Sequence, residues 1–279
     1  MTDTRSSVLI TVDELADRIA GEPGLVLLDI SDDLETAPLE RPVVPGAIAV
    51  SLASDISGPA SKEGGRRPLP DPGALQKTLQ GFGIDADSSV VVYDNASGAQ
   101  AGRAWWTLRW AGHENVRLLD GGLAAWTAAG HNTAPDPAHA PGGGSIVVTP
   151  GGMPVIDADD AADIARNGAL LDARGKAAYE GDPGKTATGH IPGAICAGAK
   201  DALGPDGVFK STEDLRVMFE NLGVDGSQPA GVYCGSGNAA AFELAGIYAA
   251  GLAAQLYVGS WSAWTGDPDR PVAQGPDRG

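Results

Sequence analysis

Short apolar runs alternate with amphipathic stretches along the first half of the chain. The predicted strands are apolar runs of a few residues each, at 25–28, 90–93 and 116–119. The predicted helices carry apolar residues at helical spacing, at 12–19, 74–79 and 101–110. Strands that alternate with helices indicate a parallel sheet that is covered on both faces.

The second half of the chain shows the same alternation. Its predicted strands lie at 170–171, 231–233 and 254–258. Its predicted helices lie at 157–166, 212–222 and 239–250. Ligands of parallel sheets bind at the carboxyl ends of strands, where loops lead into helices. The loops after Tyr93 and Tyr233 are therefore the expected places for a functional site.

Four sequence motifs occur twice, in the same order and about 140 residues apart. The pairs are Leu27-Leu-Asp29 with Leu170-Leu-Asp172, Val44-Pro-Gly-Ala-Ile48 with Ile191-Pro-Gly-Ala-Ile195, Val91-Val-Tyr-Asp94 with Gly231-Val-Tyr-Cys234, and Leu118–Trp126 with Leu256–Trp264. This repeat predicts two homologous α/β domains, at 1–144 and 145–279, each a mostly parallel sheet flanked by helices. The Pro- and Gly-rich stretch 135–144 is typical of an exposed connector.

Composition narrows the range of partners. The chain has 279 residues and a formal net charge of -17, with 19 basic and 36 acidic side chains. Nucleic acids and anionic membranes are bound by basic surfaces, so we expect neither as a partner. No apolar run approaches the ~18 residues that a membrane span needs, and we expect a cytoplasmic protein. The two cysteines, Cys196 and Cys234, are too few for a disulfide framework or a closed zinc site.

Cys234 follows a predicted strand and precedes a glycine-rich turn and an alanine-rich helix. Gly235 and Gly237 would allow consecutive backbone N–H groups to point inward and bind an anion. N–H groups at a helix start also favour the thiolate, which is the nucleophilic form of cysteine. The first half has Asp94 in this place, so it cannot supply the thiol. A cysteine-based phosphatase would need an arginine six residues after the cysteine, where Ala240 stands.

These motifs resemble those of the tandem-domain rhodanese-like sulfurtransferases, which include thiosulfate sulfurtransferase and 3-mercaptopyruvate sulfurtransferase. The matching segments are Leu171-Asp-Ala-Arg174, Gly189-His-Ile-Pro-Gly-Ala194, Cys234-Gly-Ser-Gly237, Gly259–Trp264 and, in the first half, Arg103–Arg109 and Asp120-Gly-Gly122. The resemblance covers nearly the whole chain. It implies two rhodanese-like domains, the first without catalytic function because Asp94 replaces the cysteine, and the second catalytic through Cys234.

The resemblance also implies a transfer of sulfur in two steps. Cys234 would take the sulfane sulfur of a small anionic donor, thiosulfate or 3-mercaptopyruvate, and form a persulfide. A small thiol, cyanide or a thioredoxin-like protein would then accept this sulfur, with no metal or organic cofactor. The expected substrate-binding residues are those of the loop, with one lysine from a neighbouring loop: Gly235, Ser236, Gly237, Asn238, Ala239 and Lys185.

The chain departs from the family pattern at the expected donor site. Ala178 stands where relatives often carry an arginine, and Val44 stands where the mercaptopyruvate branch has a histidine. The loop continues as Asn238-Ala239 in place of the usual Val-Thr. The start of the loop favours mercaptopyruvate-like donors, because the thiosulfate branch has Arg-Lys after the cysteine. The depleted donor site leaves an alternative function, a persulfide carrier or regulatory module with little turnover.

Four further features each have a structural interpretation that we prefer. Arg174 is expected to form an ion pair within the Asp-x-Arg turn, and His190 is expected to stabilise a turn by hydrogen bonding. Cys196 is expected to be a buried thiol, although a partner for oxidised Cys234 is the alternative. The pair Arg66-Arg67 is expected to be solvated, the alternative being positive charge beside the site.

Overall fold

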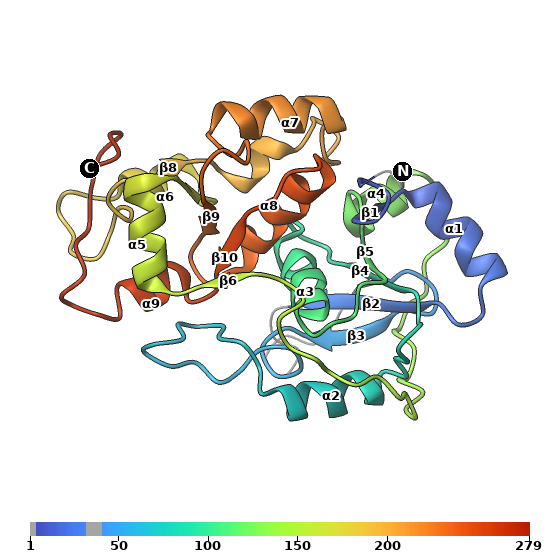
Figure 1. The fold of residues 1–279 in the computed structure, drawn as a ribbon. Helices are drawn as coiled ribbons and strands as arrows, with labels where there is room; N and C mark the ends of the chain where they lie inside the picture. Colours follow the sequence, from blue (N-terminus) through green and yellow to red (C-terminus); the bar gives the residue numbers. More distant parts are fainter. Residues whose placement is uncertain (1–3, 32–40) are drawn as a thin grey trace. The chain divides into compact units, whose positions relative to one another are not determined.

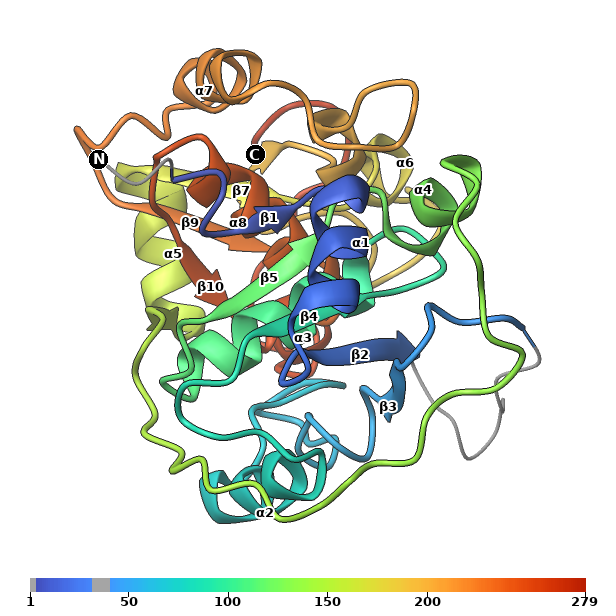
Figure 2. The same ribbon diagram turned by 90° about the vertical axis from the view of Figure 1, so that its right-hand side faces the viewer.

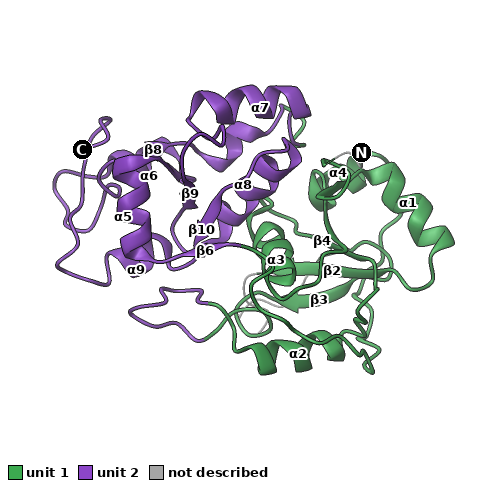
Figure 3. Ribbon diagram, viewed as in Figure 1, with its two compact units in different colours: residues 1–58, 69–153, 205–208 green, residues 59–68, 154–204, 209–279 purple. Residues whose placement is uncertain are grey.

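The computed structural model describes residues 4–31 and 41–279 of the chain (Figure 1). It divides into two compact units (Figure 3). Unit 1 comprises residues 1–58, 69–153 and 205–208, and unit 2 comprises residues 59–68, 154–204 and 209–279. A short segment of each half of the chain therefore packs with the other half's unit. The division at residues 144 and 145 stays a prediction.

Unit 1 is built on a five-stranded parallel sheet with the order β1-β5-β4-β2-β3, which can be followed in Figure 2. Its strands are β1 (Leu9–Ile10), β2 (Val26–Ser31), β3 (Ile48–Ser51), β4 (Val90–Tyr93) and β5 (Val116–Leu119). Its helices are α1 (Val12–Gly21), α2 (Pro72–Gly81), α3 (Ala99–Trp110) and α4 (Gly122–Ala128).

Unit 2 repeats this sheet, with the order β6-β10-β9-β7-β8 and parallel pairing throughout. Its strands are β6 (Val155–Ile156), β7 (Ala169–Asp172), β8 (Ile195–Cys196), β9 (Ala230–Tyr233) and β10 (Gln255–Tyr257). Its helices are α5 (Ala158–Asn167), α6 (Lys176–Glu180), the short 3₁₀ turn η1 (Ala199–Ala202), α7 (Thr212–Asn221), α8 (Asn238–Ala249) and α9 (Ser260–Trp264).

The register of the two sheets reproduces the sequence repeat. Asp29 of β2 lies opposite Tyr93 of β4, and Asp172 of β7 lies opposite Tyr233 of β9. Tyr93, Asp172 and Tyr233 are the last residues of their strands, and Asp29 lies two residues before the end of β2. The predicted fold class, two α/β domains with parallel sheets flanked by helices, is confirmed.

The helix that follows each functional loop is almost completely buried. Helix α8 is apolar on every side, with nine of its twelve residues buried, as expected for a helix enclosed by other elements. Helix α3 holds Trp105 and Trp106 at no exposure. Because both helices are fixed by packing, the loops that enter them are fixed at their carboxyl-side ends.

The exposed connector 135–144 is attached to unit 1. The Gly142 and Gly144 N–H groups donate to carbonyls at the end of α2, and Ile146 beyond them is 3% exposed. Among the described residues, no helix combines the length and the apolar character that crossing a membrane requires.

Candidate active site

Cys234 lies directly after β9, at the carboxyl end of the central strand, as the sequence predicts. The loop Gly235–Gly237 then turns into α8, and Gly237 begins this helix with a left-handed backbone, φ +84°. The Gly237 N–H donates to the Cys234 Sγ over 3.1 Å. Cys234 is only 3% exposed, so its sulfur is held by the loop and is not a free surface thiol.

The start of α8 offers further hydrogen-bond donors. Within the described residues, no side chain caps α8, and the backbone N–H groups of Asn238, Ala239 and Ala240 have no acceptor. Such orphan donors, together with the helix dipole, favour a negative charge at the helix N-terminus. The Cys234 sulfur is therefore placed at an anion-binding position.

The corresponding loop of unit 1 shows what this arrangement binds. The buried Asp94 carboxylate accepts four backbone N–H groups at 2.9–3.1 Å, those of Ala96, Gly98, Gln100 and Ala101. Gly98 begins α3 with φ +80°, as Gly237 begins α8. The loop of unit 1 is thus an anion-binding loop that holds its own carboxylate. The same architecture in unit 2 holds a thiol.

Helix α9 fixes the backbone of Cys234 from the other side. The Cys234 N–H donates to the Ser260 Oγ at 3.1 Å, and the Trp261 N–H donates to the Cys234 carbonyl at 2.9 Å. The Ser262 N–H donates to the Gly235 carbonyl at 3.0 Å. Ser260 is fully buried with φ +52°, a conformation that a non-glycine residue rarely adopts. The segment Gly259–Trp264 is one of the motifs shared with the family, but its role at the cysteine does not follow from the sequence.

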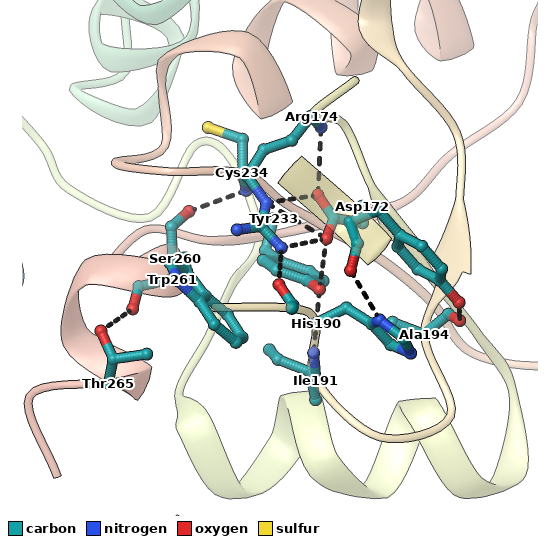
Figure 4. A network of polar contacts seen from close by, with 12 residues as sticks. Asp172, Arg174, His190, Ile191, Ala194, Tyr233, Cys234, Ser260, Trp261 and Thr265 are labelled. Carbon is teal, nitrogen blue, oxygen red and sulfur yellow. Dashed lines mark hydrogen bonds and ion pairs between the residues drawn. The ribbon is translucent and has the colours of Figure 1, made fainter. Parts of the chain in front are cut away.

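Below the loop lies a buried network centred on Asp172 (Figure 4). The Tyr233 hydroxyl donates to Asp172 Oδ2 at 2.6 Å and accepts the Ile191 N–H at 3.1 Å. Arg174 binds both carboxylate oxygens of Asp172, with Nη2 to Oδ2 at 2.6 Å and Nε to Oδ1 at 2.9 Å. The predicted structural ion pair of Arg174 is confirmed. Figure 4 shows the Cys234 sulfur pointing away from this network.

Electrostatics keep this network in one protonation state. Burial raises the pKa of Tyr233 well above its usual value of 10.0, and the Asp172 carboxylate raises it further. Burial alone would lower the pKa of Arg174, but its bonds to Asp172 raise it above the usual value. The hydroxyl therefore stays protonated and the guanidinium stays charged, so the network serves as a fixed support for the loop.

His190 has the hydrogen-bonding role that the sequence predicts. Its Nδ1 donates to the Tyr179 carbonyl at 2.9 Å, because a carbonyl oxygen only accepts. The imidazole stacks on the Tyr179 ring with centroids 3.7 Å apart, and His190 has no exposure. It positions the turn that leads into β8.

Two predicted substrate-binding residues have specific surroundings. The Lys185 Nζ lies 3.1 Å from Asp182 Oδ2 on an exposed loop, near Val272 and Gln274. Asn238 occupies the first turn of α8, and its Oδ1 is buried without a partner within the described residues. The substrate-binding roles of Lys185, Asn238 and the rest of the loop stay predictions.

Arg66 is not simply one of two solvated loop residues. Its backbone N–H donates to the Ser262 Oγ at 3.0 Å. A Cβ added to Gly235 would lie 3.1 Å from Arg66 Nη2, so the guanidinium lies against the residue that follows Cys234. The side chain is exposed, yet it stands beside the loop. This contact favours the alternative expectation for Arg66, positive charge beside the site.

The expectation of a buried Cys196 needs a correction, because this residue is half-buried. It lines a cavity of about 270 Å³ with Met218, Asn221 and the buried Glu243. Burial raises the pKa of Cys196, and the Asp172 carboxylate raises it further. A smaller fraction of this thiol is therefore ionised than of a free cysteine at the same pH. Across residues 4–31 and 41–279, no three His, Cys, Asp or Glu side chains gather as metal ligands.

Comparison with known proteins identifies the class of protein that this fold and site define. The family model described as "Rhodanese-like domain" matches residues 11–129 and again residues 157–267. The chain belongs to the rhodanese-like family, with one domain in each half. It is a sulfurtransferase, an enzyme that moves sulfur from a donor to an acceptor.

Individual relatives match the chain over almost its full length. A Pseudomonas aeruginosa protein named "Probable 3-mercaptopyruvate sulfurtransferase" is 43% identical, over 97% of this chain and 99% of that protein. A Mycobacterium tuberculosis protein named "Putative thiosulfate sulfurtransferase SseB" is 40% identical, over 97% and 98%. A Thermus thermophilus protein named "Sulfur carrier protein TtuD" is 27% identical, over 96% and 97%.

Solved structures support the fold. The Tum1 protein of Saccharomyces cerevisiae superposes with a TM-score of 0.79 at 21% sequence identity, over 97% of this chain and 99% of that chain.

Proposed function

We propose that Cys234 is the nucleophile of this sulfurtransferase, that it carries the transferred sulfur as a persulfide, and that the donor is thiosulfate or 3-mercaptopyruvate. The observation that carries the proposal is the pair of loops. The loop of unit 1 binds a carboxylate through four N–H groups. The loop of unit 2 has the same helix start and a sulfur in its place.

The first step balances for both donors. The Cys234 thiolate attacks the outer sulfur of thiosulfate, the S–S bond of the donor breaks, and sulfite leaves with its electron pair. With 3-mercaptopyruvate the C–S bond breaks, the carbon takes up the thiol proton, and pyruvate leaves. In each case the product on the enzyme is the anion Cys234–S–S⁻. The N–H groups of Asn238, Ala239 and Ala240 would stabilise this charge, as an oxyanion hole does.

The second step regenerates the thiolate. A nucleophilic acceptor attacks the outer sulfur of the persulfide and takes it away, leaving the Cys234 thiolate. The acceptors that this chemistry favours are cyanide, a small thiol or a thioredoxin-like protein. Neither step, as written, uses a metal or an organic cofactor.

Intact-protein mass spectrometry tests the proposal directly. The reduced protein is incubated separately with thiosulfate and with 3-mercaptopyruvate, beside a Cys234→Ser variant. We expect the mass to increase by one sulfur atom in the native chain and to remain unchanged in the variant. A Cys196→Ser variant is the matched control and should still gain the sulfur. Failure of the native chain to gain sulfur from either donor, with Cys234 reduced, contradicts the proposal.

A second candidate function is a persulfide carrier with little turnover. The likeness to the sulfur carrier of Thermus thermophilus favours it, as does Ala178 at a position where relatives often have an arginine. The two functions differ in the second step. A carrier would form the Cys234 persulfide once and retain it in excess cyanide, whereas an enzyme would release thiocyanate over many cycles.

A further inference from the structure

Residues 59–68 precede Cys234 by more than one hundred and sixty positions, yet they pack within unit 2. Figure 3 colours this segment with the second half of the chain. It brings a basic residue, Arg66, to the loop Cys234–Gly237. The family motifs quoted from the sequence do not include Arg66.

The backbone around Arg66 is fitted to the turn before α9. Gly65 has φ +76°, and a Cβ there would lie 2.5 Å from both the Gly259 carbonyl oxygen and the Ser262 Oγ. Only glycine therefore allows this approach. Ser262 then accepts the Arg66 N–H through its Oγ and donates its own N–H to the Gly235 carbonyl, both at 3.0 Å. One residue thus fixes Arg66 and the catalytic loop together.

Among the residues that the structure describes, the Arg66 guanidinium has no carboxylate partner and forms no side-chain hydrogen bond. Two other basic groups of unit 2 are already engaged: Arg174 binds Asp172, and Lys185 lies beside Asp182. In a chain with a net charge of -17, an exposed guanidinium beside the proposed nucleophile creates a local site for an anion.

We propose that Arg66 binds the sulfonate group of thiosulfate and is the residue that makes this dianion a donor; the inference rests on the proposed function of Cys234. The planar guanidinium presents paired N–H groups that match two oxygens of a sulfonate. Its Nη2 lies 3.1 Å from the point where a Cβ of residue 235 would stand. From there it meets the group that leaves as sulfite when Cys234 takes the outer sulfur.

Thiosulfate depends on this charge more than 3-mercaptopyruvate does. The sulfonate of thiosulfate is bonded directly to the transferred sulfur, so both negative charges approach the Cys234 thiolate closely. The carboxylate of 3-mercaptopyruvate is separated from its sulfur by two carbons, and the donor carries one charge less when its thiol is protonated. Arg66 therefore lowers a repulsion that is stronger for thiosulfate. The positive charge of Arg66 would thereby replace the Arg-Lys pair of the thiosulfate branch, where this chain has Gly235 and Ser236.

The test measures how persulfide formation on Cys234 depends on donor concentration. The full-length Arg66→Ala and Arg66→Lys variants are compared with the native chain, and Lys62→Ala, an exposed position in the same segment, is the matched loss of one positive charge. We expect Arg66→Ala to raise the half-saturating thiosulfate concentration about tenfold, a moderate value for a partly screened charged hydrogen bond. Arg66→Lys should raise the half-saturating thiosulfate concentration by a smaller factor. Lys62→Ala should change that concentration less than about twofold.

Each outcome has a definite meaning. A larger rise for thiosulfate than for 3-mercaptopyruvate in Arg66→Ala, with full persulfide at saturating thiosulfate, supports the inference. An unchanged thiosulfate dependence, an equal rise for both donors, or an equal loss in Lys62→Ala overturns it while the role of Cys234 stands. No persulfide in the native chain overturns both proposals. Circular dichroism would reveal a folding defect in Arg66→Ala. In that case the Arg66→Lys variant, which keeps the positive charge and a long side chain, still tests the inference.

Discussion

Ser260 combines two features that rarely occur together in a buried residue. Its backbone has φ +52°, and its Oγ both accepts the Cys234 N–H and donates to the Tyr257 carbonyl. A positive φ costs a non-glycine residue on the order of 1 kcal/mol or more. A glycine would avoid this cost but would lose the hydroxyl. The side chain therefore has a function that offsets the strain, and this function is to hold the backbone of Cys234.

Two variants separate strain from hydrogen bonding at Ser260. Ser260→Ala keeps the strain and leaves the Cys234 N–H without an acceptor, so we expect a loss of stability of about 1–3 kcal/mol. Ser260→Gly loses the same bond but relieves the strain, so it should be more stable than Ser260→Ala. Both should form the persulfide more slowly at saturating donor. The measurements are thermal unfolding and the rate of mass gain; native rates in both variants would exclude a positioning role.

At the scale of single residues, the sequence predicted what lies within one continuous segment. Cys234 at a strand end, with glycines and a helix after it, could be read directly, as could the Asp172–Arg174 pair. The role of Ser260 could not, and for Arg66 the sequence offered a place beside the site only as an alternative, because both roles arise from contacts between segments that lie apart in the chain. No local pattern marks a guanidinium that reaches a loop across more than one hundred and sixty residues.

Among the elements, helix α8 has an unusual composition. It is apolar on all sides except at Glu243, which is 1% exposed with its Oε2 unpartnered within the described residues. Burial raises the pKa of this carboxyl well above its usual value of 4.5, and the Asp172 and Asp201 charges raise it further. Glu243 is therefore neutral in the folded protein over a range of pH in which the unfolded chain is ionised.

This difference predicts a pH-dependent effect of Glu243→Gln on stability. Above pH 4.5 the unfolded chain loses a proton that the folded protein retains, so native stability falls by up to about 1.4 kcal/mol per pH unit until the folded pKa is reached. Glutamine has no proton to lose. We expect the variant to gain stability over the native chain from pH 5 to pH 8. Denaturant unfolding at several pH values checks this, and a constant difference would contradict it.

The sequence predicted the central elements closely and the edge strands not at all. Strands β4 and β5 begin and end at the expected residues, and Asp157 is the N-cap of α5 through a capping box with Asp160. Strands β1, β6 and β8 have two residues each, and a run of that length shows no periodicity. Their pairing depends on a neighbouring strand that already exists. Segments of this kind are defined by the sheet and not by their own sequence.

At the scale of the whole molecule, the charge balance affects stability. A net charge of -17 on 279 residues makes the folded chain repel itself at low ionic strength. At 0.1 M, sodium chloride largely screens the interaction between exposed charges that are more than about 10 Å apart. We therefore expect the temperature at the midpoint of thermal unfolding to rise as sodium chloride increases from about 10 to about 200 mM, because screening changes most over this range. Equal concentrations of uncharged glycerol monitor nonspecific effects, and a falling midpoint with salt would contradict the expectation.

The division into units also explains why the two-domain pattern was visible in the sequence while its details were not. The repeated motifs lie on the central strands and their loops, which both units keep. Residues 59–68 and 205–208 pack with the unit of the opposite half. These exchanged segments have no counterpart in the repeat, since each belongs to one half only. A boundary drawn from the motifs alone cannot include them.

The carboxylate of Asp94 bears on how such a molecule changes over generations. A duplicated domain that replaces its thiol with aspartate gains four hydrogen bonds to the backbone, each worth on the order of 1 kcal/mol. The reverse mutation must give them up before any catalytic benefit exists. Mutation and selection for stability therefore make such a replacement progressively harder to reverse. With Cys234 as the nucleophile, as proposed above, the asymmetry between the two halves reinforces itself, because selection for sulfur chemistry then acts on the half that keeps the cysteine.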